Sequence, residues 1–189
     1  PRVDEARATA RGLRKLTGKH LTLWTDLPSQ PAVDELPEAF DQAVPQYCDY
    51  FGFDAAGRAN WQVTGFLMKD RKPYQELGLL PAGLPPFQTG YGWDDLIWVC
   101  EQSTDYYRRH LLLHEGVHSF MMTQLGSCGP PWYMEGVAEL LATHNWQDNR
   151  LTLKTIPRRT EDVPMWGRIG LLRKAIAADR ARALSDVLG

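Results

Sequence analysis

The sequence lacks a long hydrophobic run, a large excess of either charge and a paired-cysteine motif. No apolar segment approaches the roughly 20 residues that a membrane-spanning helix requires, so we expect no membrane span within this chain. The 21 Lys and Arg residues nearly balance the 23 Asp and Glu residues, for a formal net charge of -2. Without a basic field, nucleic acid and anionic membrane surfaces are not favoured as partners.

Cysteine is scarce as well, and Cys48, Cys100 and Cys128 lie far apart in the sequence. They form no Cys-x-x-Cys pair of the kind that indicates a thiolate metal site. Buried free thiols are the favoured interpretation, whereas one disulfide with one free thiol would suit an exported protein. The compartment stays open, with a periplasmic or extracellular location slightly favoured, and the oligomeric state stays open too.

The length of 189 residues suits one domain with a sizeable core and a cleft. The chain begins at Pro1 without a Met and stops at Gly189 just after a helical pattern. We therefore expect a single domain over residues 1–189 that has been excised from a longer chain.

Hydrophobic periodicity and chain-breaking residues predict a mixed α+β fold. We expect helices over 2–17, 31–51, about 104–125, 132–144 and 168–188, strands over 19–25, 61–68, 93–100 and 151–156, and loops over 70–92 and 157–167. The strand over 61–68 is apolar on both faces, which predicts an interior position in a sheet. The loop over 70–92 is rich in Pro and Gly yet apolar, which favours an ordered loop beside a functional site.

Potential chemistry concentrates in the helix expected after residue 104, where His114, Glu115 and His118 form a His-Glu-x-x-His pattern. Residues four apart share one face of a helix, so both imidazoles can reach a single ion. Glu115 then lies beside the ion rather than on it. This arrangement is typical of zinc held by imidazole nitrogens, with a neighbouring carboxylate as general base toward water.

A third ligand is needed, because catalytic zinc takes three protein ligands and keeps one position for water. Glu135 follows His118 after sixteen residues, enough for the chain to turn at Gly129-Pro130-Pro131 and for a second helix to return. Glu139 lies one turn after Glu135 and can accept a hydrogen bond from a ligand imidazole. The reverse assignment of these two glutamates stays open.

Three further residues near the motif have expected structural roles. The small residues Gly136 and Ala138 are expected to let the two helices approach closely. His110 precedes His114 by one turn, and a helix rises about 6 Å over four residues. We therefore expect His110 to support the site or lie at the surface rather than to share the ion.

The two parts of the motif together resemble the gluzincin zinc metallopeptidases, which include thermolysin-like and aminopeptidase-like enzymes. The resemblance rests on His114-Glu115-x-x-His118 followed by Pro131-Trp132-Tyr133-Met134-Glu135-Gly136-Val137-Ala138-Glu139. It is greatest for small bacterial domains of the peptidase MA-like superfamily, of the DUF1570 type, and covers residues 104–145 most closely. The resemblance implies that His114, His118 and Glu135 bind Zn²⁺ and that Glu115 is the base. The aminopeptidase signature is not recognisable, so aminopeptidase specificity is not implied.

The resemblance also implies a zincin-like fold, in which a small thermolysin-like sheet packs on the two site helices. Its edge strand lines the cleft and pairs with an extended substrate, and residues 93–100 are the expected edge. Such enzymes use a Tyr or a His to stabilise the oxyanion, for which Tyr91, Tyr133 and His144 are the candidates.

The sequence thus predicts a zinc metallopeptidase that cleaves a peptide or protein substrate with Glu115 as general base. The main alternative is a non-catalytic peptidase-like binding module that retains zinc and the cleft. A structural metal site with a fourth protein ligand and an enzyme with a non-peptide substrate also stay open. Glu115 favours catalysis, since a binding module has no need of that carboxylate. The choice between endo- and exopeptidase activity is not determined.

Overall fold

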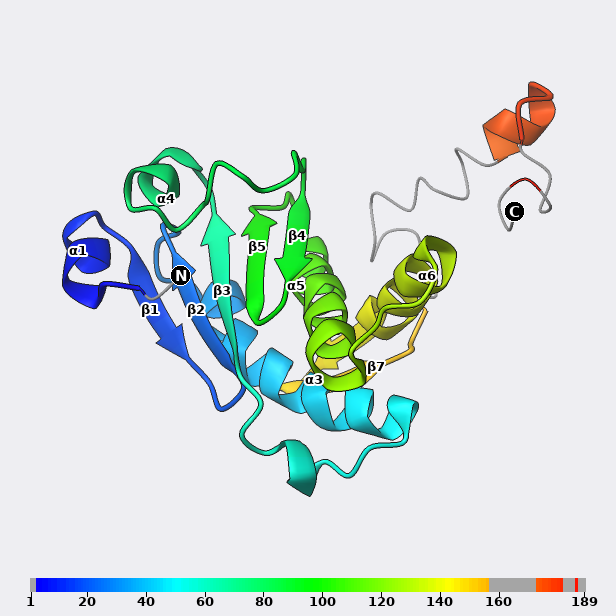
Figure 1. Ribbon diagram of the computed structural model, residues 1–189, viewed down its shortest axis with the longest axis horizontal. Coiled ribbons are helices and arrows are strands. Elements are labelled where there is room, and N and C mark those ends of the chain that lie inside the picture. The colour runs from blue at the N-terminus through cyan, green and yellow to red at the C-terminus, as the bar shows by residue number, and fades with distance from the viewer. Residues whose placement is uncertain (1–2, 157–172, 182–185, 187–189) are drawn as a thin grey trace.

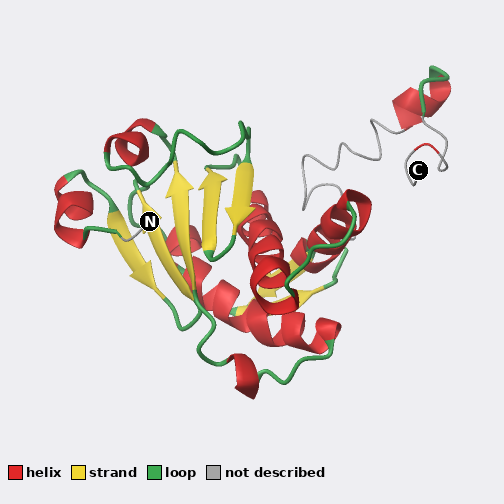
Figure 2. Ribbon diagram, viewed as in Figure 1, coloured by secondary structure: helices red, strands yellow, loops and turns green. Residues whose placement is uncertain are grey.

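The computed structural model describes residues 3–156, 173–181 and 186 and has a mixed α+β fold (Figure 1). Its elements in chain order are α1 (Glu5–Ala10), β1 (Arg14–Thr17), β2 (Leu21–Thr25), α2 (Pro31–Asp34), α3 (Leu36–Phe51), η1 (Ala56–Arg58), β3 (Val63–Met68), α4 (Lys72–Glu76), β4 (Gly90–Trp93), β5 (Leu96–Cys100), α5 (Asp105–Phe120), the π-helix η2 (Met121–Leu125), α6 (Pro131–Ala142), β6 (His144–Gln147) and β7 (Arg150–Leu153). Figure 2 distinguishes the helices from the strands.

The main sheet has five strands in the order β1-β2-β3-β5-β4. The three central strands are parallel, and β1 and β4 are antiparallel to their neighbours. The predicted interior position of 61–68 is confirmed, because β3 pairs on both sides. The prediction that 93–100 forms the edge is wrong: β5 lies between β3 and β4, so Gly90–Trp93 is the edge strand.

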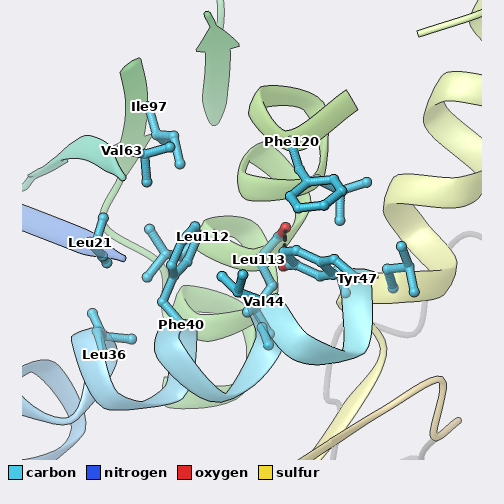
Figure 3. Close-up of a cluster of buried hydrophobic side chains, with 14 of the residues drawn as sticks. Leu21, Leu36, Phe40, Val44, Tyr47, Val63, Ile97, Leu112, Leu113 and Phe120 are labelled. Carbon is cyan, nitrogen blue, oxygen red and sulfur yellow. Dashed lines mark hydrogen bonds between the residues drawn. The ribbon is translucent and has the colours of Figure 1, made fainter. Parts of the chain in front are cut away.

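Successive side chains of a strand point to opposite faces of the sheet. Each face of this sheet carries its own hydrophobic cluster. One hydrophobic cluster joins β3 and β5 to α3, α5 and α6 through residues such as Val63, Ile97 and Leu112. Figure 3 shows this cluster, in which the Tyr47 hydroxyl donates to the Leu113 carbonyl at 3.0 Å. The other cluster contains Trp98 and packs against α1 and α4. The first of these clusters therefore holds α5 against the sheet.

The helix predicted over 2–17 is only partly correct. The helix α1 ends at Ala10, and Gly12 then adopts a φ of 82°, which favours glycine. Arg14–Thr17 instead pairs with β2 as an antiparallel strand. Apolar spacing within a short segment does not reveal this pairing, since the partner strand supplies the hydrogen bonds.

The loop predicted over 70–92 contains the short helix α4 and most of strand β4. Arg71 anchors the intervening segment, because its guanidinium donates to the Phe87 carbonyl at 2.7 Å and to the Gln88 carbonyl at 3.2 Å. The segment is thus ordered, as predicted, and it leads into the edge strand.

A second sheet, the hairpin β6–β7, includes one strand that the sequence analysis missed. The predicted helix over 132–144 ends at Ala142, and His144 begins β6. Asp148 and Asn149 turn the hairpin with φ values of 50° and 57°. Asp and Asn tolerate this left-handed conformation, so the Asp-Asn pair between apolar runs was the available signal.

The remaining helix predictions are largely confirmed for the described residues. The predicted helix over 31–51 is divided into α2 and α3, and α3 continues through Pro45. The loop predicted over 157–167 lies outside the described residues, as does about half of the helix predicted over 168–188. In the described part of that prediction, residues 173–177 are helical, but the helix does not continue through 178–181, where Asp179 has a φ of 51°. Within the described part of the chain, no helix combines the length and apolarity needed to cross a bilayer. All three cysteines are unpaired.

Candidate metal centre

The helix α5 carries the His-Glu-x-x-His pattern and is held by its apolar face. Thr104 caps its N-terminus by accepting a hydrogen bond from the Tyr107 N–H at 3.2 Å. Leu113 and Val117 are fully buried against the core. This packing turns His114 and His118 toward α6, where both residues are less than a tenth exposed.

The helix α6 packs antiparallel to α5, as the pairing of their polar side chains indicates. The carboxylate of Glu135 lies beside His114 and His118, and that of Glu139 lies beside His110 and His114. Moving forward along α6 therefore corresponds to moving backward along α5.

The expected contribution of small residues to this helix contact is half correct. Ala138 is fully buried between the elements, as predicted. Gly136 is exposed, and a Cβ atom there would meet nothing within 4 Å. A close approach of a different helix pair, α5 and α3, occurs at Gly116 of α5, where a Cβ atom would lie 2.5 Å from Cε2 of Phe40. Gly116 thus sets the distance between α5 and α3.

Three donor groups converge between the two helices. The Nε2 atoms of His114 and His118 are 3.1 Å apart, and the two oxygens of Glu135 lie 3.2 Å and 3.7 Å from them. A tetrahedral ion with bonds of about 2.1 Å holds its ligand atoms about 3.4 Å apart. The donor set of two imidazoles and one carboxylate therefore fits zinc in atom type and in spacing.

A second group of potential ligands adjoins the first, formed by His110, His114 and Glu139. Glu139 Oε1 lies 3.4 Å from His114 Nδ1, and Glu139 Oε2 lies 3.4 Å from His110 Nε2. An imidazole that binds an ion through Nε2 carries its proton on Nδ1. With His114 bound in this way, Glu139 is positioned to accept that proton's hydrogen bond while it also holds His110.

Glu115 lies beside the three donors and against the edge strand. A Cβ atom at Gly90 would lie 2.5 Å from its Oε1 atom, and one at Gly92 would lie 2.9 Å from its backbone carbonyl oxygen. Burial raises the pKa of Glu115 to about 7, and the charge of Glu135 adds to the rise. The backbone N–H of Gly92 acts in the opposite direction. The sequence analysis did not predict that these two glycines contact Glu115, although Gly-x-Gly in a strand signals a close approach.

The electrostatics of the site favour one positive charge at the convergence point. Burial acts to lower the pKa of His114, but the hydrogen bond to Glu135 and the surrounding carboxylates raise it overall. Burial and the charge of His114 lower the pKa of His118 to about 4. The hydrogen bond from His114 lowers the pKa of Glu135. A bound cation would satisfy the same carboxylates.

The structure does not bring the three predicted oxyanion residues to this centre. Tyr91 lies on the opposite face of the sheet, stacked 6.4 Å from Trp98. Tyr133 lies two residues before Glu135, so it points away from the face of α6 that carries Glu135. His144 is buried in β6, where its Nδ1 lies 2.8 Å from the Ala142 carbonyl oxygen.

His144 instead belongs to a buried cluster that sequence reasoning missed. Arg109 of α5 lies 3.2 Å from its Nε2 atom and also pairs with Glu35. Tyr106 stacks on the His144 ring at 4.5 Å and on His110 at 5.8 Å. The cluster joins the start of α5 to β6 and so fixes the α5–α6 unit.

Comparison of the chain with protein-family models, curated proteins and solved structures gives no match.

Proposed function

We propose that this chain is a zinc-dependent peptidase-like hydrolase with a zincin-like arrangement of sheet and site helices. His114, His118 and Glu135 are the zinc ligands, and Glu115 is the general base. One observation carries the proposal: two imidazoles and one carboxylate converge within ligand distance of a single point, with the buried Glu115 beside them. A structural site would instead close its coordination with a fourth protein ligand.

Zinc held by His114, His118 and Glu135 would supply Lewis-acid chemistry toward a scissile carbonyl and a water molecule. Glu115 takes a proton from the attacking water and delivers it to the nitrogen of the leaving amine. Glu139 holds the His114 ring in one orientation and tautomer. His118 lies on the face of α5 that His114 occupies, so both rings are directed by one rigid helix.

The edge strand β4 supports a peptide as the substrate. Gly90 and Gly92 face α5, which keeps the strand's backbone close to Glu115. Within the described part of the chain, no strand pairs with the outer edge of β4. An extended peptide that adds to this edge would place its backbone beside the three donors.

The test is the Glu115→Gln substitution in the zinc-loaded protein, assayed against a broad peptide library. The change preserves the side chain's size but removes the base, so we expect zinc binding to persist and hydrolysis to fall by about 10²- to 10⁴-fold. The matched control is Glu76→Gln on α4, where an exposed ion pair with Arg11 is lost and hydrolysis should be unchanged.

Equal hydrolysis by the wild-type and Glu115→Gln proteins would overturn the proposed mechanism. Stoichiometric zinc without cleavage of any peptide in the library would favour the non-catalytic binding module. Absence of zinc binding by the wild-type protein would exclude both.

A further inference from the structure

The face of β4 that points away from α5 carries a row of stacked aromatic side chains. Phe87 and Tyr91 have ring centroids 5.9 Å apart, and Tyr91 and Trp93 have centroids 6.5 Å apart, with interplanar angles of 17° and 13°. Tyr91 also stacks on the buried Trp98, and the Arg71 guanidinium covers Phe87 at 4.4 Å. Phe87 and Tyr91 are therefore packed against the core.

The other end of the row is open to solvent. Trp93 is 55% exposed, although its ring is held parallel to Tyr91 by stacking. The main chain after Trp93 is also held, because the Ser119 hydroxyl donates to the Asp94 carbonyl and ties the β4–β5 turn to α5. A rigid exposed aromatic of this kind offers contact area at a low entropic cost.

In the described part of the chain, the outer edge of β4 has no strand partner, although the Gly92 N–H already interacts with the Glu115 carboxylate. The Cys100 N–H donates to the Thr89 carbonyl at 2.7 Å, and exchanging pairs alternate along an antiparallel ladder. Tyr91 therefore exchanges hydrogen bonds with Trp98, whereas Gly90 and Gly92 direct their N–H and carbonyl groups to the outer edge. The influence of the Gly92 N–H on the Glu115 carboxylate agrees with this orientation.

We propose that Tyr91 and Trp93 form a side-chain subsite that selects an aromatic or large apolar residue in an extended peptide paired with β4. This inference rests on the proposed function, because it assigns a specificity to the same cleft. A residue paired across from Tyr91 points to the same face of the sheet, about 5 Å away at Cβ. Its side chain then contacts Tyr91 and Trp93, while its neighbours in the peptide point toward the metal centre.

The charges beside Trp93 favour an apolar side chain at this position over an acidic one. Asp94 and Asp95 are exposed and occupy the turn directly after Trp93. An acidic peptide side chain would be repelled by these carboxylates. An aromatic ring has no such cost and gains stacking on Trp93.

The experiment compares binding of matched extended peptides that carry Phe, Leu, Ser or Glu at one position, scanned along the peptide. Binding is measured by fluorescence polarisation to the full chain with zinc and the Glu115→Gln substitution, so that cleavage does not interfere. We expect one position at which Phe binds about 3- to 10-fold more tightly than Ser, the magnitude of one aromatic contact.

Three further substitutions in the same background locate the preference. Trp93→Ala should abolish it, and Trp93→Phe should retain most of it; neither is expected to unfold the chain, because the side chain is exposed. Trp132→Ala is the matched control, since Trp132 is 51% exposed but lies on α6. Loss of the preference in Trp132→Ala, or its persistence in Trp93→Ala, would overturn the subsite.

The same peptides, assayed for cleavage by the protein with Glu115 intact, separate this inference from the proposed function. Cleavage without any preference for aromatic residues would overturn the subsite and leave the peptidase in place. Selective binding without cleavage would support the subsite and overturn the peptidase. Failure of every peptide to bind would overturn the subsite.

Discussion

The carboxylate of Glu115 lies so close to the backbone of Gly90 that a Cβ atom on Gly90 would come within 2.5 Å of Oε1. The edge strand and the motif helix are therefore matched in shape at the residue that we assign as the base. Any side chain at position 90 must displace either the strand or this carboxylate.

Gly90→Ala should disturb Glu115 more than the zinc ligands. We expect peptide hydrolysis to fall at least about 10-fold, because a small misplacement of a catalytic group has effects of that order or larger. The clash should also cost about 1–3 kcal/mol of unfolding free energy. Kinetics, zinc content and urea unfolding would be measured together. Gly83→Ala is the control, since a Cβ atom there meets nothing within 4 Å.

Substitutions of the donors should separate ligands from supporting residues. His114→Ala, His118→Ala and Glu135→Ala should each abolish stoichiometric zinc binding, whereas Glu139→Ala should weaken zinc affinity about 10- to 100-fold. Affinities would be measured by competition with a chromophoric chelator. A larger loss from Glu139→Ala than from Glu135→Ala would reverse the roles assigned to the two glutamates.

Gly116→Ala should destabilise the contact between α5 and α3. Its Cβ atom would lie 2.5 Å from Cε2 of the fully buried Phe40, and overpacking of this kind costs about 1–3 kcal/mol. Gly136→Ala should instead stabilise the protein by about 0.5–1 kcal/mol, because the helical site is open. Both values follow from urea unfolding at one zinc concentration.

A double-mutant cycle tests the cause of the Gly116→Ala effect. In a Phe40→Leu background, the ring atoms that meet the new methyl group are gone, so the substitution should cost less. An equal cost in both backgrounds would mean that contact with Phe40 is not responsible.

The buried His144 should make the fold sensitive to acid. Burial lowers its pKa from 6.5 to about 3, and the charge of Arg109 adds to the shift. Between these values the unfolded chain binds a proton that the folded chain does not. The free energy of unfolding therefore falls as pH drops below about 6.5, by up to about 1.4 kcal/mol per pH unit from this group.

His144→Gln removes this proton and should give a shallower decline. Urea unfolding of both proteins between pH 4.5 and 7, with a chelator present to exclude metal binding, gives the difference in slope. Equal slopes would show that His144 does not remain neutral in the folded chain.

Those parts of the site that lie within one helix could be predicted from the sequence alone. The spacing of His114 and His118 determines that both rings share a face of α5, since helical geometry is local. Thr104 marks the start of that helix, and Gly126 marks the end of the π-helix η2 that follows it. The Gly-Pro-Pro break likewise indicated α6 and its glutamates.

Only the tertiary structure decided which elements meet. Pairing between strands depends on partners distant in sequence, so it placed Arg14–Thr17 in the sheet and gave the edge to Gly90–Trp93 rather than to 93–100. The same packing brought Gly90 against Glu115 and buried His144 away from the metal centre. Helical periodicity predicts which side of its own helix a residue lies on. A contact between two elements depends on the shapes of both packed surfaces.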